Sequence, residues 1–145
     1  MRGTRASIRL SALCACGQTS MALDGEVLSM LLCTCLDCQK ATGTGHSAAA
    51  MVHESALQLS GPVRSHAVTA ASGATLSRHF CSGCGTPLFA VSSRSPQTRL
   101  IAVGFFGAET DWFEPRHVLF ARSHNDWDVL PPIPRHATYP ERPER

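Results

Sequence analysis

The sequence predicts a mainly β protein of short antiparallel strands with one short helix. Short stretches rich in apolar and β-branched residues recur along the 145 residues, and glycine-containing turns separate several of them. Helix start and stop signals lie close together in the segment after the central cysteine motif. Hydrophobic residues make up 43% of the chain and charged residues 17%, which is typical of a globular protein.

The length fits one domain of ordinary size. We predict a single domain over residues 1–145, with an ordered core at about 6–135 and a frayed tail at 140–145. No apolar run approaches the ~20 residues that a membrane span needs. Arg9 and Ser11 interrupt the apolar stretch near the start, so no segment has signal-peptide length. We therefore expect a cytoplasmic protein that does not bind membranes.

The first predicted strand is residues 7–12, where polar and apolar residues alternate. Cys14 and Cys16 continue this parity, so both thiols would project from one face if the chain stays extended. Gly17 permits a tight turn directly after them.

The central predicted strand is "EVLSMLLCT", residues 26–34, which is nearly continuous in apolar character and is expected to be buried on both faces. A short helix follows in "TCLDCQKATG". Thr34 and Asp37 have the spacing of a capping box, and Gly43 can end the helix after about two turns.

Further short strands are expected along the rest of the chain. Residues 71–73 turn two of them into a hairpin, and Pro87 begins another at a position where proline is permitted. The segments are "SAAAMV", "ALQLSG", "VRSHAVTA", "ATLSRHFC", "RLIAVGFF" and "HVLFA".

Seven cysteines form three clusters and leave none outside. Their odd number argues against a complete set of intramolecular disulfides, and buried structural cysteines would be expected to scatter singly. Clustered thiols at such short spacing are typical of zinc ligands. The clusters are Cys14 and Cys16; Cys33, Cys35 and Cys38; and Cys81 and Cys84.

The first and last clusters together can make one closed site. Cys81 and Cys84 have the spacing of half a zinc site, and Cys14 and Cys16 can donate the other two sulfurs. A closed site offers no position for a substrate, so we expect it to be structural and to tie the first strand to a distant hairpin.

Cys33, Cys35 and Cys38 then remain as three ligands without a fourth cysteine. A histidine, a carboxylate or an exchangeable molecule could take the fourth position. Zinc with three thiolates carries less negative charge than zinc with four, so an open site could better activate an anion or polarise a carbonyl. A lone histidine is more often an ordinary residue than a ligand. The histidines are His46, which is nearest in sequence, His53, His66, His79, His117, His124 and His136.

Longer motifs surround the cysteines. They are "CACG" at 14, "CTCLDCQKATG" at 33, "FCSGCGTPLF" at 80, "HVLF" at 117 and Trp127. With these motifs in this order, the sequence resembles the glutathione-dependent formaldehyde-activating family, which also includes centromere protein V. The resemblance spans nearly the whole chain.

The resemblance implies a β-tent fold with zinc knuckles and two zinc ions per chain. It assigns Cys14, Cys16, Cys81 and Cys84 to a structural zinc, and Cys33, Cys35 and Cys38 to a catalytic zinc. The implied activity is that of a carbon–sulfur lyase of the S-(hydroxymethyl)glutathione synthase type. Glutathione and formaldehyde, or a related small aldehyde, would be its substrates.

The sequence leaves one other function open and disfavours another. A non-catalytic, zinc-stabilised binding module stays open as an alternative, because one fold can host different functions. Nucleic-acid binding is disfavoured by charge: seven bound thiolates remove seven units, two zinc ions restore four, and the formal +2 becomes −1. Homo-oligomerisation also stays open.

Overall fold

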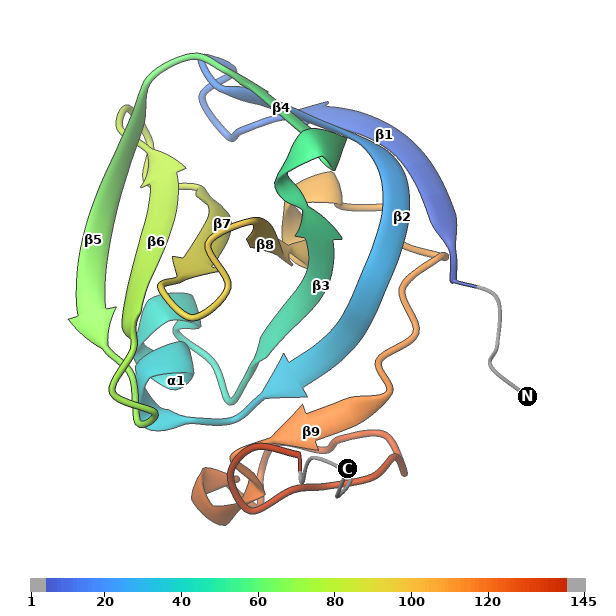
Figure 1. The fold of residues 1–145 in the computed structure, drawn as a ribbon, viewed down its shortest axis with the longest axis vertical. Coiled ribbons are helices and arrows are strands. Elements are labelled where there is room, and N and C mark those ends of the chain that lie inside the picture. Colours follow the sequence, from blue (N-terminus) through green and yellow to red (C-terminus); the bar gives the residue numbers. More distant parts are fainter. Residues whose placement is uncertain (1–4, 141–145) are drawn as a thin grey trace. The chain divides into compact units, whose positions relative to one another are not determined.

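The computed structural model describes residues 5–140 and is mainly β, as predicted (Figure 1). Among these residues α1 (Leu36–Thr42) is the single α-helix, and it follows the central cysteine motif. None of the helices in this part of the chain is long and apolar enough to cross a membrane. The strands are β1 (Ser7–Leu13), β2 (Ser20–Cys33), β3 (Ser47–His53), β4 (Leu57–Ser60), β5 (Val63–Thr69), β6 (Thr75–Cys81), β7 (Pro87–Ser92), β8 (Thr98–Ala102) and β9 (His117–Leu119).

The strands follow the hydrogen-bonded order β1-β2-β3-β8-β7-β6-β5, and β4 and β9 also pair with β2. β1 and β2 form an antiparallel pair from Ser7↔Glu26 to Leu13↔Ser20. β5, β6 and β7 lie side by side in Figure 1 and are antiparallel as well. β9 departs from the antiparallel prediction, because it runs parallel to the end of β2.

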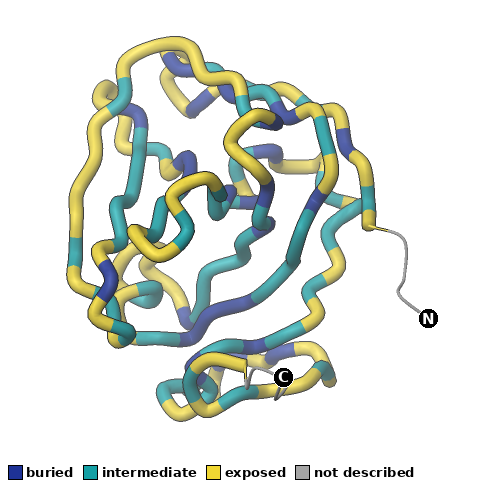
Figure 2. Tube along the Cα trace, in the orientation of Figure 1, coloured by how far each residue is buried: buried dark blue, intermediate teal, exposed yellow. Residues whose placement is uncertain are grey.

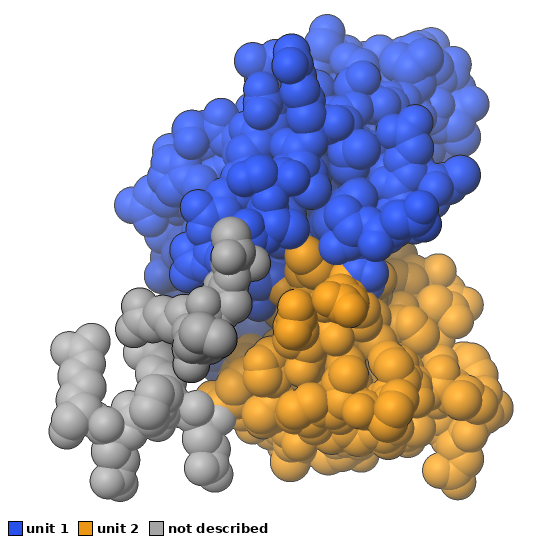
Figure 3. Space-filling view, turned by 90° about the vertical axis from the view of Figure 1, so that its right-hand side faces the viewer, with its two compact units in different colours: residues 1–29, 50–113 blue, residues 30–49, 114–145 orange. Residues whose placement is uncertain are grey.

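The described chain divides into two compact units, which Figure 3 colours separately. Unit 1 comprises residues up to 29 together with 50–113, and unit 2 comprises residues 30–49 together with those from 114 onward. The single domain over 1–145 stays a prediction. Of the predicted frayed tail, residues 141–145 lie outside the described part of the chain.

The extent of burial differs among the strands of unit 1, and Figure 2 shows it along the trace. In β1 the buried and half-buried residues occupy every second position, as the alternation predicts. The hairpin between β5 and β6 closes where Gly73, with φ 86°, donates its N–H to the Ala70 carbonyl. The largest fully buried apolar side chains of this unit are Met21, Leu23, Val52, Leu88 and Ile101.

Unit 2 is built around the end of β2, α1 and β9. Leu31 to Cys33 pair with His117 to Leu119, and the N–H of Val118 continues the ladder by donating to the Pro134 carbonyl. Val118 is fully buried and Leu32 nearly so. This small core holds the segment from which the central cysteines project.

Three local predictions are wrong. The central strand was expected over residues 26–34 and buried on both faces, but β2 begins at Ser20 and its residues 28–31 are only half-buried. Cys35 caps α1 instead of Thr34, whose hydroxyl bonds elsewhere. The predicted strand "RLIAVGFF" stops at Ala102, and residues 103–106 form a 3₁₀ helix.

Candidate metal centres

The first cysteine cluster lies in unit 1, where the chain leaving β1 meets the turn after β6. Its four sulfurs, from Cys14, Cys16, Cys81 and Cys84, all lie within 4.8 Å of one another. The Cys14 Sγ is 3.5 Å from the Cys16 Sγ and 3.6 Å from the Cys81 Sγ. A tetrahedral zinc with Zn–S bonds of about 2.3 Å separates its sulfur ligands by roughly 3.8 Å. The spacing therefore fits a metal ion of this kind.

Two glycine turns shape this cluster. The Gly17 N–H donates to the Cys14 carbonyl at 3.0 Å, so the chain turns at once and does not stay extended. The Gly85 N–H donates to the Cys81 carbonyl at 2.8 Å. Both glycines have positive φ, 80° and 76°, which other residues adopt only with strain. The turns bring each pair of sulfurs together.

Thr86 connects the two turns and forms a hydrogen bond with one of the ligands, Cys84. Its Oγ1 accepts a hydrogen bond from the Ala15 N–H at 3.2 Å, which leaves the hydroxyl hydrogen for the Cys84 Sγ at 3.1 Å. The Thr86 hydroxyl first, and then its backbone N–H, lower the pKa of Cys84 to about 5. A lowered pKa favours the thiolate, the form in which cysteine binds metal.

The second cluster lies in unit 2 and comes from one short stretch of chain. Cys33 ends β2, Cys35 caps α1 and Cys38 lies in its first turn. Their sulfurs lie within 4.8 Å of one another, and no histidine or carboxylate of residues 5–140 joins them. The described residues thus supply three ligands and no fourth, so completion of the site by a histidine has no support in this geometry.

Two of the three thiols, those of Cys33 and Cys35, have pKa values raised above the ordinary value for cysteine. Hydrogen bonds with Cys35 and Cys38, followed by burial, raise the pKa of Cys33. The Cys38 N–H donates to the Cys35 Sγ at 3.3 Å, as expected for a helix N-cap. A metal ion would have to displace these protons, and thiolates are ligands that zinc prefers.

A hydrogen-bond network fixes the backbone between the cysteines. The Thr34 hydroxyl donates to the Phe120 carbonyl at 2.7 Å, inside the core of unit 2. The Gln39 Nε2 donates to the Thr34 and Ser123 carbonyls at 2.9 and 3.0 Å, and its Oε1 accepts from Asn125 at 3.1 Å. Gln39 belongs to the motif "CQKATG", but nothing in the sequence indicated that its side chain connects the cysteine segment to Ser123 and Asn125.

A histidine–aspartate pair lies in the same unit. His46 Nδ1 is 2.8 Å from Asp128 Oδ2, and Asp128 is buried. His46 was considered from the sequence as a possible fourth ligand, and Asp128 was missed. These residues are 82 positions apart, so no local spacing could have paired them.

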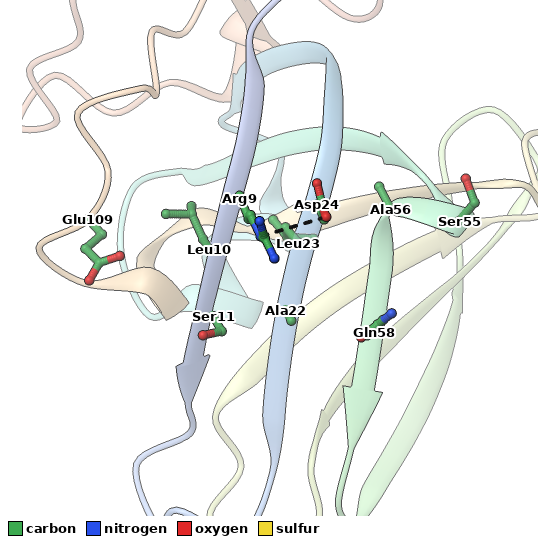
Figure 4. A pocket seen from close by; sticks show the side chains of 10 residues that line it. All are labelled: Arg9, Leu10, Ser11, Ala22, Leu23, Asp24, Ser55, Ala56, Gln58 and Glu109. Carbon is green, nitrogen blue, oxygen red and sulfur yellow. Dashed lines mark ion pairs between the residues drawn. The ribbon is translucent and has the colours of Figure 1, made fainter.

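A surface hollow in unit 1 is separate from both clusters. It is lined mainly by β1, β2 and the segment that leads into β4, and it contains none of the cysteines. Its charged pair, Arg9 with Asp24 at 4.0 Å, is highly exposed (Figure 4). An exposed ion pair of this length contributes little binding energy, so the hollow is a weaker candidate site than either cluster.

Comparisons with known proteins bear on the fold and the family of this chain. The chain shares its fold with a crystal structure of a Rhodobacter sphaeroides protein, with a TM-score of 0.56 and 16% sequence identity over 73% of this chain and 97% of that one. The comparison with curated proteins found no match. The family model described as "Glutathione-dependent formaldehyde-activating enzyme" matches residues 9–123, which include all seven cysteines. The chain therefore belongs to the glutathione-dependent formaldehyde-activating enzyme family.

Proposed function

We propose that this protein is a zinc-dependent enzyme of the carbon–sulfur lyase type, which joins the thiol of glutathione to formaldehyde or a related small aldehyde. The observation that carries the proposal is the three-cysteine cluster. It offers a metal three soft ligands and no fourth from the described chain. Family membership supports the reaction class.

The two clusters have different proposed roles. Cys14, Cys16, Cys81 and Cys84 hold a structural zinc, since four sulfurs complete a tetrahedron. Cys33, Cys35 and Cys38 hold the catalytic zinc. When bound there, the metal supplies positive charge that can stabilise a thiolate or a developing alkoxide.

The residues around the catalytic site have positioning roles in this proposal. Thr34 and Gln39 hold the backbone that carries the three cysteines, so the sulfurs keep their mutual spacing. Cysteines persist without disulfides in a reducing compartment, and no disulfide joins the cysteines of the described chain, which supports a cytoplasmic location.

Magnetisation-transfer NMR tests the proposal. Glutathione and formaldehyde combine spontaneously and reversibly, so an enzyme must raise the exchange rate in both directions without moving the equilibrium. We expect catalytic amounts of zinc-loaded protein to accelerate this exchange, and Cys38→Ala not to do so. A rate equal to that without protein would refute the proposed activity and would favour a non-catalytic zinc-stabilised module.

A further inference from the structure

His46 and Asp128 form a close pair of titratable side chains outside the cysteine clusters. The Asp128 side chain is 9% exposed and the His46 side chain 27%. A carboxyl group at such depth is normally paired, and here the histidine ring supplies the partner at 2.8 Å. The remaining exposure of His46 lets its ring meet a small molecule.

The surrounding residues hold Asp128 in place. The Asp128 N–H donates to the Asn125 carbonyl at 3.0 Å, and the ring of His124 contacts the Asp128 backbone carbonyl. Gly45 leaves room for the carboxyl group, since a Cβ there would lie within 2.7 Å of three Asp128 side-chain atoms. The backbone contacts with Asn125 and His124 therefore hold Asp128 in position beside the imidazole of His46.

The same pair is tied to the cysteine loop at two points. The Thr42 hydroxyl lies 2.8 Å from the Cys38 carbonyl and 3.4 Å from the His46 carbonyl. On the Asp128 side, Asn125 donates to Gln39, next to Cys38 in α1. Both partners are therefore anchored to the helix that carries a proposed metal ligand.

The hydrogen bond selects one form of the imidazole. A carboxylate oxygen can only accept, so Nδ1 of His46 carries the proton and donates it to Asp128. The other ring nitrogen, Nε2, then has its lone pair free. A histidine held in this way can take a proton and later return it.

We propose that His46 is the acid–base residue of the thiol–aldehyde reaction and that Asp128 is its positioning residue. The inference rests on the proposed function and adds the missing proton path. The thiol proton goes to Nε2, the sulfur electron pair forms the S–C bond, the C=O π electrons move to oxygen, and Nε2 returns the proton to that oxygen. Nothing is oxidised or reduced.

The first test compares two histidine variants in the NMR exchange assay with zinc-loaded protein. We expect His46→Ala to slow exchange by about 100-fold or more while glutathione affinity stays unchanged. Added imidazole should restore part of the lost rate. His66→Ala is the matched control, because His66 is exposed on β5 in unit 1, and it should keep the wild-type rate.

The second test reads the tautomer directly, by ¹⁵N NMR of the histidine rings. We expect His46 in the wild-type protein to carry its proton on Nδ1, and Asp128→Asn to shift it toward Nε2. Wild-type protein with the proton on Nε2 would overturn the proposal, even if the variants fail to fold.

The outcomes separate this inference from the function on which it rests. If wild-type protein accelerates exchange and His46→Ala does so equally, the acid–base role is wrong and the enzyme assignment stands. If wild-type protein does not accelerate exchange, the enzyme assignment fails, and the acid–base role fails with it.

Discussion

The two cysteine clusters use the same ligand atom but are built in different ways. The cluster in unit 1 joins two segments 65 positions apart in sequence, from Cys16 to Cys81. The cluster in unit 2 comes from the six residues from Cys33 to Cys38. A metal at the four-cysteine cluster can cross-link distant parts of the chain, whereas the three-cysteine cluster belongs to one short segment.

This difference in sequence separation explains a difference in expected role. Closing a long loop restricts the unfolded chain, so a metal at the four-cysteine cluster would stabilise the folded state. Closing a six-residue loop restricts little. The three-cysteine cluster instead depends on Thr34 and Gln39 for its geometry, so a metal bound there is not expected to be needed for the fold.

The largest predicted effect compares Cys84→Ala with Cys38→Ala. Cys84 is exposed, so its replacement costs little packing and reports mainly the lost metal cross-link. A covalent link of this span contributes about 4 kcal/mol. We expect Cys84→Ala to lower the Tm by more than about 10 °C, and Cys38→Ala to lower it by only a few degrees, as measured by circular dichroism.

Zinc content of the same preparations provides the control. Each variant should bind one equivalent of zinc where the wild type binds two. If the two variants lose the same stability, the proposed division between a structural and a reactive cluster is wrong.

The second prediction concerns removal of the metal from wild-type protein. We expect a chelator to take the zinc of the three-cysteine cluster first, because that cluster supplies one fewer sulfur. The circular dichroism spectrum should stay unchanged during this step. It should change only when the second equivalent leaves, since that loss opens the long loop. A dye that reports free zinc can follow both steps.

A single kinetic phase accompanied by unfolding would contradict this order. It would indicate that both ions support the fold, as expected for a non-catalytic module. Loss of the wild-type protein's NMR exchange activity after the first equivalent, with the fold intact, would sharpen the contrast instead.

The cysteine clusters could be predicted from sequence because ligand type and short spacing are local signals. Cys81 and Cys84 form a recognisable half-site, and the four-plus-three division follows from counting. The strands could be predicted for the same reason, since alternation is a local pattern. β9 was expected as a strand, but its parallel pairing depends on a partner far away in the chain.

The parts of the site that were missed all depend on distant contacts. Thr34 was expected to cap the helix, but the carbonyls of Leu119 and Phe120 bind its hydroxyl, and Cys35 becomes the cap. Asp128 gave no sequence signal, since its role is defined by His46. Hydrogen bonds between segments so far apart in sequence produce no local pattern from which they could be predicted.

The smallest predicted effect concerns the stability of unit 1 at acid pH. It distinguishes the contribution of the four-cysteine cluster from that of the neighbouring residue His79. His79 stacks on Phe89 with ring centroids 4.5 Å apart, and the Arg99 guanidinium lies over the same phenyl ring. Burial first, and then the Arg99 charge, lower the pKa of His79 below its usual 6.5. The unfolded chain therefore takes up this proton more readily, and the free energy of unfolding should fall as the pH drops below about 6.5.

His79→Phe should keep the stacked ring and remove this titration, so its stability should depend less on pH between 7 and about 5.5. Urea denaturation of zinc-loaded protein at several pH values measures the difference. Protonation of the cysteine ligands also destabilises the fold as pH falls, and the variant leaves that contribution in place. If the free energy of unfolding of His79→Phe depends on pH as steeply as that of the wild type, the whole acid sensitivity belongs to the cysteine clusters. A weaker dependence on pH would show that the β6–β7 face contributes independently of the metal.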